Sequence, residues 1–166
     1  MIIENKVIDN FLEKEDYLSI KHMMLDDWKN FPWFYTPSVA SLDDDDIYFV
    51  HTFQEKQFNL QSPTLNNLTP ILKKMNITDL WRVKGNLFPN QNKFIEHNSH
   101  IDYDEPHQAA IYYINTNDGY TKLEDGTKVD SVANRLLLFN GSKHHSSTNC
   151  TNDKIRVNIN FNYISK

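Results

Sequence analysis

Three residues in the second half of the chain have the types and spacing of metal ligands. His100 and Asp102 are separated by a single residue, and His145 follows much later in the chain. In an extended backbone alternate side chains point to the same side, so we predict that His100 and Asp102 leave one strand on one face. An imidazole from a distant strand would complete a set of two histidines and one carboxylate. This set binds non-haem Fe(II) and leaves positions open for a cosubstrate and dioxygen.

His144 competes with His145 for the third ligand position. Adjacent residues of a strand face opposite sides, so only one of the two can point toward the metal. Counting back from Arg156 and forward from Phe139 favours His145. We therefore expect His144 to lie outward or at the rim of the site.

The segment from Lys154 to Tyr163 alternates between apolar and polar residues. Its odd positions are apolar, whereas its even positions carry Arg156 followed by three asparagines. If helices cover the apolar face, the polar face points into the interior, where an unpaired guanidinium is costly. Arg156 is then expected to bind a carboxylate through two charge-assisted hydrogen bonds. On a solvent-exposed sheet it would instead be an ordinary surface arginine.

The length and composition indicate one folded domain spanning residues 1–166. The chain has 166 residues, 39% hydrophobic and 13% aromatic, which is enough for a packed core. A net charge of -5 disfavours a nucleic-acid partner that binds through a broad basic face, although it leaves a local basic patch open. The oligomeric state is not predicted.

The expected location is the cytoplasm. Cys150 is the only cysteine, so an intrachain disulfide is impossible and the pattern fits a reducing compartment. The N-terminal residues lack the basic segment and apolar run of a signal peptide, and no stretch has the length of a membrane span. We therefore expect a soluble protein without membrane contact.

The first half of the chain predicts two helices and a few strands. Residues 2–8 read as a short strand, Asp9 or Asn10 as the cap of a helix from Leu12 to Asn30, and residues 31–37 as an aromatic loop or edge strand. A strand over 47–53 and a second helix, capped by Ser62 and running to Met75, should follow. The acidic run of residues 43–46 is expected to be a solvated turn, or else a rim that attracts a basic substrate.

The second half predicts a β-rich core. Turn signals separate strands expected over 81–88, 93–96, 100–103, 107–115, 120–123, 127–129, 135–139 and 154–163. Two helices followed by about eight short strands fit a mostly β (α+β) fold, a double-stranded β-helix or jelly roll with N-terminal helices packed on one sheet. Residues 1–79 would be the helical support and residues 80–164 the jelly-roll core.

These motifs together resemble a known enzyme family. The order of His100-Ile101-Asp102, Ile111-Tyr112-Tyr113-Ile114-Asn115, the segment 134–139, His145 and Arg156 resembles the Fe(II)- and 2-oxoglutarate-dependent dioxygenases, in particular their prolyl-hydroxylase-like branch. The resemblance covers roughly residues 81 to 163. It implies Fe(II) on the three ligands, 2-oxoglutarate with its distal carboxylate on Arg156, and dioxygen, with ascorbate as a candidate reductant. The reaction would hydroxylate an unactivated C–H bond and release succinate and CO2.

The resemblance also implies two further contacts with the cosubstrate. Tyr113 matches the position where this branch places a tyrosine hydroxyl on the cosubstrate carboxylate, and Tyr112 would face the opposite way. Relatives often carry another tyrosine on the strand before the His-x-Asp pair, but this chain has Phe88, which cannot donate a hydrogen bond. Asn86, on the same side of that strand, is the candidate substitute.

The expected substrate is a small molecule or a peptide, either a prolyl or other peptide residue or an amino-acid-like compound. Two alternatives stay open: a non-catalytic jelly-roll binding or structural module, and a cupin-type metalloenzyme that does not use 2-oxoglutarate. Arg135 is expected to pair with a loop carboxylate and Arg82 to line the substrate mouth, with no catalytic role for either. A metal-bound histidine usually has its other ring nitrogen held by a neighbouring group. The candidates for such groups, or for residues of the substrate pocket, are His51, His97 and His107.

Overall fold

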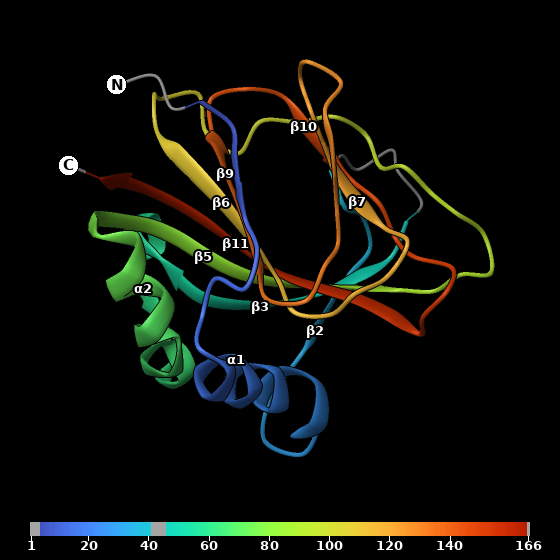
Figure 1. Cartoon of the computed structure of the whole chain (residues 1–166), viewed down its shortest axis with the longest axis horizontal. Helices are drawn as coiled ribbons and strands as arrows, with labels where there is room; N and C mark the ends of the chain where they lie inside the picture. The colour runs from blue at the N-terminus through green and yellow to red at the C-terminus, as the bar shows by residue number, and fades with distance from the viewer. Residues whose placement is uncertain (1–3, 41–45, 166) are drawn as a thin grey trace.

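The computed structural model describes residues 4–40 and 46–165, and most of its regular elements are strands (Figure 1). The strands are β1 (Lys6–Ile8), β2 (Phe34–Thr36), β3 (Tyr48–Glu55), β4 (Leu60–Gln61), β5 (Ile77–Pro89), β6 (Gln108–Tyr113), β7 (Tyr120–Leu123), β8 (Lys128–Asp130), β9 (Arg135–Asn140), β10 (His145–Ser147) and β11 (Ile155–Ser165). The helical segments are α1 (Lys14–Lys21), a π turn (His22–Asp26), 3-10 segments (Lys56–Phe58 and Pro63–Leu68) and α2 (Thr69–Met75).

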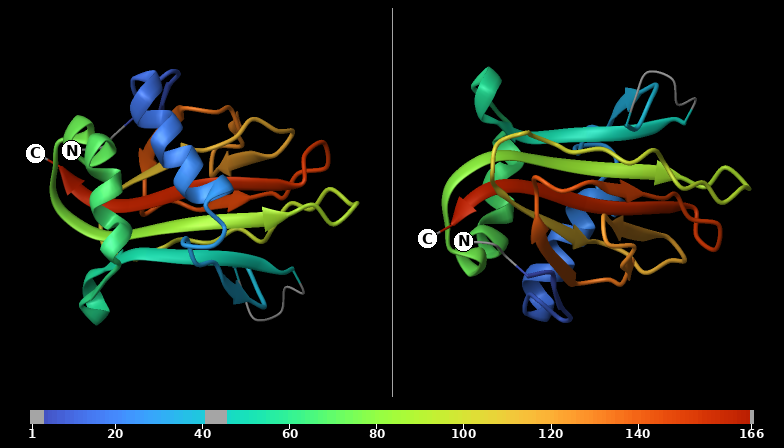
Figure 2. Two further views of the ribbon diagram at one scale, coloured as in Figure 1. Left: turned by 90° about the horizontal axis from the view of Figure 1, so that it is seen from below. Right: turned by 90° about the horizontal axis from the view of Figure 1, so that it is seen from above.

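Two antiparallel sheets enclose the interior. The larger sheet has the order β1-β9-β6-β11-β5-β3-β2, with β4 paired to β3, and the smaller has the order β10-β7-β8. Both α1 and α2 lie on one face of the larger sheet, as the two views of Figure 2 show, and the smaller sheet covers the other face. The predicted mostly β jelly roll with helices on one sheet is therefore confirmed. No helix within the described residues combines the length and apolar character that crossing a membrane requires.

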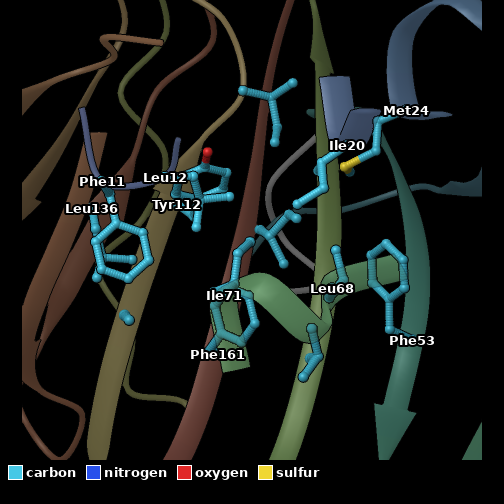
Figure 3. Close-up of a cluster of buried hydrophobic side chains, with 14 of the residues drawn as sticks. Phe11, Leu12, Ile20, Met24, Phe53, Leu68, Ile71, Tyr112, Leu136 and Phe161 are labelled. Atoms are coloured by element: carbon cyan, nitrogen blue, oxygen red, sulfur yellow. The ribbon is translucent and has the colours of Figure 1, made fainter. Parts of the chain in front are cut away.

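The central strand β11 separates two interiors by its alternation. Val157, Ile159 and Phe161 are fully buried on the helix side, in the cluster partly drawn in Figure 3. The even-numbered side chains, from Arg156 to Asn162, point to the side of the smaller sheet and are buried as well. Because side chains alternate with a period of two, one strand supplies both an apolar core and a polar interior.

The N-terminal helix is shorter than predicted. It begins at Lys14, after Glu13, which makes no capping hydrogen bond with its side chain, and the α-helical part ends at Lys21. Neither Asp9 nor Asn10 caps it, because Asp9 pairs with Arg135 and Asn10 adopts a left-handed backbone with φ 50°. The tertiary ion pair therefore takes the side chain that a local pattern assigned to the cap.

The second helix and the aromatic segment agree with expectation. The Ser62 hydroxyl accepts a hydrogen bond from the backbone N–H of Thr64 at 3.3 Å, and helical structure continues to Met75, although its first part is 3-10 rather than α. The aromatic segment forms the edge strand β2. Of the acidic run, Asp43, Asp44 and Asp45 lie outside the described residues.

Two predicted strands in the second half are wrong. Residues 93–96 and 100–103 form no continuous ladder, and pair only through the isolated bridges Glu96 to Thr148 and His100 to His145. Beyond His100 the chain bends at Asp102, and Pro106, which has no N–H to donate, follows shortly after. The predicted alternation of His100 and Asp102 along one strand is therefore not what orients these two side chains.

His51 on β3 is a buried imidazole whose tautomer follows from its contacts. Its Nδ1 lies 2.8 Å from the carbonyl oxygen of Pro32, and its Nε2 lies 3.0 Å from the hydroxyl of Ser62 and 3.1 Å from that of Thr64. Nδ1 therefore donates to the carbonyl, and in the neutral ring Nε2 accepts from a hydroxyl. Burial lowers the pKa of His51, and the hydrogen bond to Pro32 offsets this only in part.

This burial predicts a pH dependence of stability. Above the ordinary histidine pKa of 6.5, His51 is neutral in both states and contributes no pH dependence. Below it the unfolded chain binds a proton that the folded chain does not, so the free energy of unfolding should fall by up to about 1.4 kcal/mol per pH unit. Urea unfolding across this range should show a shallower decline for His51→Gln, and the exposed His22→Gln should behave like the wild type. Equal slopes for wild type and His51→Gln would contradict the assignment.

Candidate metal and cosubstrate site

A two-residue backbone ladder brings the two predicted histidine ligands together. The backbone N–H of His100 donates to the carbonyl of His145 at 3.0 Å, and that of His145 donates to the carbonyl of His100 at 3.0 Å. Directly opposed residues of an antiparallel pair project to the same side of the sheet. The two imidazole centroids accordingly lie 4.7 Å apart.

Asp102 completes the cluster from the loop. Its carboxylate oxygens lie 3.7 Å from Nε2 of His100 and 4.0 Å from Nε2 of His145. One ligand atom from each residue falls within 4.8 Å of the others, a spacing that one ion can span with small side-chain movements. His144 instead points outward, with 56% of its side chain exposed and its Nδ1 3.8 Å from Glu124. The structure thus brings together the three residues that were predicted as ligands.

Three side chains hold the Asp102 carboxylate in place. Arg82 forms an ion pair with Oδ1 at 2.6 Å, and the amide groups of Asn160 and Asn162 each donate to Oδ2 at 2.9 Å. Burial alone would raise the pKa of Asp102, but the guanidinium of Arg82 and the neighbouring His145 outweigh it and keep the pKa well below its usual range. Asp102 is therefore ionised, as a metal ligand must be.

The two imidazoles are oriented for coordination through Nε2. Nδ1 of His145 lies 3.3 Å from the carbonyl of Lys143, and Nδ1 of His100 lies 3.4 Å from that of Asn98. Burial lowers the pKa of His145 to about 4, although the Asp102 carboxylate acts in the opposite direction. Nδ1–H donation to a backbone carbonyl leaves the Nε2 lone pair facing the cluster.

Of the three histidines that were candidates for such neighbouring groups, His107 contacts the cluster through Asn162. Its Nε2 lies 3.1 Å from the amide nitrogen of Asn162, and its Nδ1 lies 2.8 Å from the carbonyl oxygen of Glu105. Nδ1 therefore donates and Nε2 accepts, which fixes the amide of Asn162 with its nitrogen toward Asp102. His51 lies in the helix-side interior instead, and His97 stacks on Phe88 with centroids 5.2 Å apart.

Arg156 is fully buried and has neutral partners. Its Nη1 donates to the hydroxyl of Ser147 at 2.8 Å and to the carbonyl of Thr148 at 3.1 Å, and its Nη2 donates to the hydroxyl of Thr121 at 3.3 Å. Within residues 4–40 and 46–165, no carboxylate lies at ion-pair distance from it and its Nε has no hydrogen-bond partner. Burial lowers the pKa of Arg156 to about 10, so the guanidinium stays charged at neutral pH. The arrangement fits a site for an external anion.

Tyr113 lies beside Arg156, and Asn86 lines the cavity. The ring of Tyr113 lies 5.8 Å from the guanidinium carbon of Arg156, and its hydroxyl donates to Thr121 at 2.9 Å. Tyr112 packs in the opposite, helix-side core. The amide of Asn86 donates to the side-chain oxygen of Asn158 at 3.0 Å, so Asn86 is available at the cavity wall but is engaged with a neighbour.

Comparison with known proteins identifies the fold. No family model and no curated protein matches the sequence. A prolyl hydroxylase from Trichoplax adhaerens, in complex with a peptide fragment of the hypoxia inducible factor oxygen degradation domain, superposes with a TM-score of 0.67 at 15% identity, covering 97% of this chain and 83% of that chain. A 2OG-Fe(II) oxygenase family oxidoreductase from Burkholderia pseudomallei gives 0.71 at 10% identity, covering 96% and 84%. The chain has the fold of the 2-oxoglutarate- and Fe(II)-dependent oxygenases.

A third structure with this fold contains iron and alpha ketoglutarate. The epimerase SnoN, in complex with Fe3+, alpha ketoglutarate and nogalamycin RO, superposes with a TM-score of 0.66 at 10% identity and covers 97% of this chain and 78% of that chain. The fold that the resemblance implied is thus confirmed. At these identities the roles of individual residues must be argued from the site itself.

One cavity of this oxygenase fold joins the metal cluster to the surroundings of Arg156. It is lined by His100, Asp102 and His145 at one part and by Thr121 and Ser147, the two hydroxyl partners of Arg156, at another. The remaining lining residues are Val39, Tyr48, Lys84, Asn86, Phe88, Ile111, Ser146, Asn158 and Asn160. The cavity therefore borders both the three predicted ligands and the hydroxyl partners of Arg156.

The sequence reasoning missed part of the site. It gave Arg82 no role toward the metal ligands and overlooked Lys84, and both lie on β5. The signal was available, because alternation along β5 places Arg82, Lys84, Asn86 and Phe88 on one face. What the sequence could not supply was the register that sets this face opposite Asn160 and its neighbours on β11.

Gly119 leaves room for the Arg156 side chain. A Cβ at this position would lie 2.5 Å from Cδ of Arg156 and 2.5 Å from the carbonyl oxygen of Asn149. We expect Gly119→Ala to displace the guanidinium, weaken binding of a dicarboxylate such as glutarate at Arg156 and lower the free energy of unfolding by about 1–3 kcal/mol. Urea unfolding and equilibrium dialysis would measure the two effects. Gly126→Ala is the control, since a Cβ there meets nothing within 4 Å, so it should change stability through its φ of +86° but not binding. Unchanged binding in Gly119→Ala would show that the contact tolerates the methyl group.

Proposed function

We propose that this chain is an Fe(II)- and 2-oxoglutarate-dependent oxygenase that hydroxylates an unactivated C–H bond. One substrate, 2-oxoglutarate and dioxygen would give the hydroxylated substrate, succinate and CO2, with one oxygen atom in each of the first two products. The main support for this proposal is one cavity that is lined both by His100, Asp102 and His145 and by the hydroxyl partners of Arg156. The Arg156 guanidinium is buried and has no carboxylate partner in the described residues. The oxygenase fold supports this reading.

The donor set fits iron. His100, Asp102 and His145 would hold Fe(II), which, when bound, supplies with 2-oxoglutarate and dioxygen the oxidant for the C–H bond. The protein's part is to keep Asp102 ionised and immobile through Arg82 and Asn162, and to present both imidazoles through Nε2. A retained carboxylate ligand favours hydroxylation over halogenation, in which related enzymes leave that position to chloride.

Arg156 would anchor the distal carboxylate of 2-oxoglutarate. Its present acceptors, Ser147 and Thr121, are neutral hydroxyls, and a carboxylate would form shorter and stronger charge-assisted bonds in their place. The Tyr113 hydroxyl, which lies 2.9 Å from Thr121, would be a further donor to this carboxylate beside the two Nη atoms of Arg156. Asn86 is proposed as a further contact from the opposite wall.

The substrate is proposed to be a residue in a peptide, prolyl or other, or an amino-acid-like small molecule. Among the structures with this fold, one holds a peptide and another a small molecule.

The proposed function has a spectroscopic test. Anaerobic Fe(II) and 2-oxoglutarate together should give a weak visible charge-transfer band that neither gives alone, and the band should disappear in His145→Ala but persist in His144→Ala. In air, succinate release should follow the same pattern. A folded protein that binds iron and shows neither the band nor succinate would be a binding or structural module, or a metalloenzyme of another kind.

A further inference from the structure

Lys84 is a cation that lines the same cavity. It lies on β5, in register with Asn160 on β11 and with Thr52 on β3, so its side chain projects from the cavity wall on the same face as Asn86. Its ammonium group donates to the hydroxyl of Tyr48 at 3.4 Å, a long hydrogen bond to a neutral partner. Its charge helps to keep Asp102 ionised, but within the described residues it forms no hydrogen bond to the three predicted ligands or to Arg156.

The nearby acids do not pair with Lys84. Both oxygens of Asp102 are engaged, one by Arg82 and the other by the amides of Asn160 and Asn162. Glu55 accepts the hydroxyl of Tyr103 at 3.0 Å. Among the described residues no carboxylate lies at ion-pair distance from the Lys84 ammonium, although the charges of Asp102 and Glu55 favour its protonated form from farther away. Lys84 is therefore a cation close to the cluster that no described carboxylate contacts directly.

The charges around the cavity leave an excess of positive charge. Arg82 already compensates Asp102, so the charges of Lys84 and Arg156 remain without a directly paired carboxylate among the described residues. Burial lowers the pKa of Lys84 to about 8, with the neighbouring Arg82 adding to the effect, yet the group is still mostly protonated at neutral pH. A cation kept in this environment is stabilised by an anion that arrives with a ligand.

We propose that Lys84 binds a carboxylate of the bound ligands close to the metal cluster. Two sources share this chemistry: the carboxylate of 2-oxoglutarate next to its keto group, and a carboxylate on the substrate itself. The second source would make the substrate an acid, such as an amino acid, rather than an internal residue of a peptide. The proposal rests on the proposed function only for the identity of these ligands, because the cavity and its cations exist without iron.

The first arm tests the cosubstrate in metal-free protein. Glutarate has two carboxylates and pentanoate has one on a chain of equal length, so calorimetric titration of both isolates the second carboxylate. If Lys84 binds the second carboxylate of glutarate, Lys84→Met should weaken glutarate binding about 10- to 100-fold and leave pentanoate binding unchanged. Lys84→Arg should recover part of the loss. Arg156→Met should lower the affinity for both glutarate and pentanoate. If it does and Lys84→Met does not lower the affinity for glutarate, the assignment of Lys84 is wrong but the site at Arg156 still holds.

The second arm tests the substrate side. In Mn(II)-loaded protein saturated with 2-oxoglutarate, paramagnetic relaxation of propionate protons reports a carboxylate held near the metal. If Lys84 binds a substrate carboxylate, this relaxation should be present in wild type, absent in Lys84→Met, and unchanged in the exposed surface variant Lys73→Met. Loss in either arm supports the proposal and identifies the source. Wild-type behaviour of Lys84→Met in both arms overturns it.

Thermal unfolding of ligand-free protein separates binding from a structural role. Lys84 is partly buried and no described carboxylate contacts it directly, so Lys84→Met should unfold at the same temperature as wild type or higher. The temperature increase that glutarate produces should become smaller in this variant if the cosubstrate is the source. A Lys84→Met protein that melts well below wild type would show that the ammonium group holds the fold together, and would overturn the proposal.

Discussion

Arg156→Met is expected to raise the Kd for 2-oxoglutarate about 100- to 1,000-fold while leaving Fe(II) binding intact. Methionine fills much of the same volume but removes both charge-assisted hydrogen bonds that a guanidinium offers a carboxylate, each worth about 1.5–3 kcal/mol. Because Arg156 is fully buried and has only neutral partners in the described part of the chain, its replacement should not destabilise the fold as loss of an ion pair would. Titration of the charge-transfer band with 2-oxoglutarate would measure the Kd.

The matched control for this variant is Arg135→Met. Arg135 forms its ion pair with Asp9 on the surface, 2.6 Å away, and does not line the cavity. It should bind 2-oxoglutarate as the wild type does. If Arg156→Met keeps wild-type turnover at low 2-oxoglutarate, Arg156 is not the anchor and another group must hold the distal carboxylate.

Asp102→Ala is expected to abolish metal binding and to lower the free energy of unfolding by about 3–5 kcal/mol. The side chains of Asp102 and Arg82 are 5% and 16% exposed, so removing the carboxylate leaves a largely buried guanidinium without its counter-ion. It also leaves the amides of Asn160 and Asn162 without their acceptor. Urea unfolding of metal-free protein and Co(II) absorption would measure the two losses.

Two further variants isolate the cause. Asp79→Ala removes an exposed carboxylate that pairs with Lys56 at 2.7 Å, and surface ion pairs of this kind contribute less than about 1 kcal/mol. The double variant Asp102→Ala with Arg82→Met should regain much of the stability but none of the metal affinity. Stability close to wild type in Asp102→Ala alone would show that Arg82 finds water or another partner.

The sequence predicted the chemistry of β11 because the pattern there is local. Alternation with a period of two requires no knowledge of partner strands, so Arg156 could be assigned to the face opposite Val157 without coordinates. The preference for His145 over His144 follows the same parity and agrees with the geometry. Tyr113 and Tyr112 separate into the two interiors for the same reason.

The His100 and Asp102 pair shows a correct prediction reached through a wrong element. The two side chains do converge, but the segment forms no continuous strand. His100 is oriented by its backbone ladder with His145, and Asp102 by an arginine and two asparagines from β5 and β11. Short-range alternation predicted that the two side chains converge, and they do so because these long-range contacts favour the same side.

From the sequence alone follow the strand-rich fold class and the two faces of strands such as β11, since these depend on neighbours within a few positions. The tertiary structure alone decided where α1 begins, how Asp102 is held, and that Lys84 stands beside the cluster without an acidic partner in the described residues. Each of these depends on register between strands far apart in the chain, and on the cost of burying charge, which is defined only once the chain has folded.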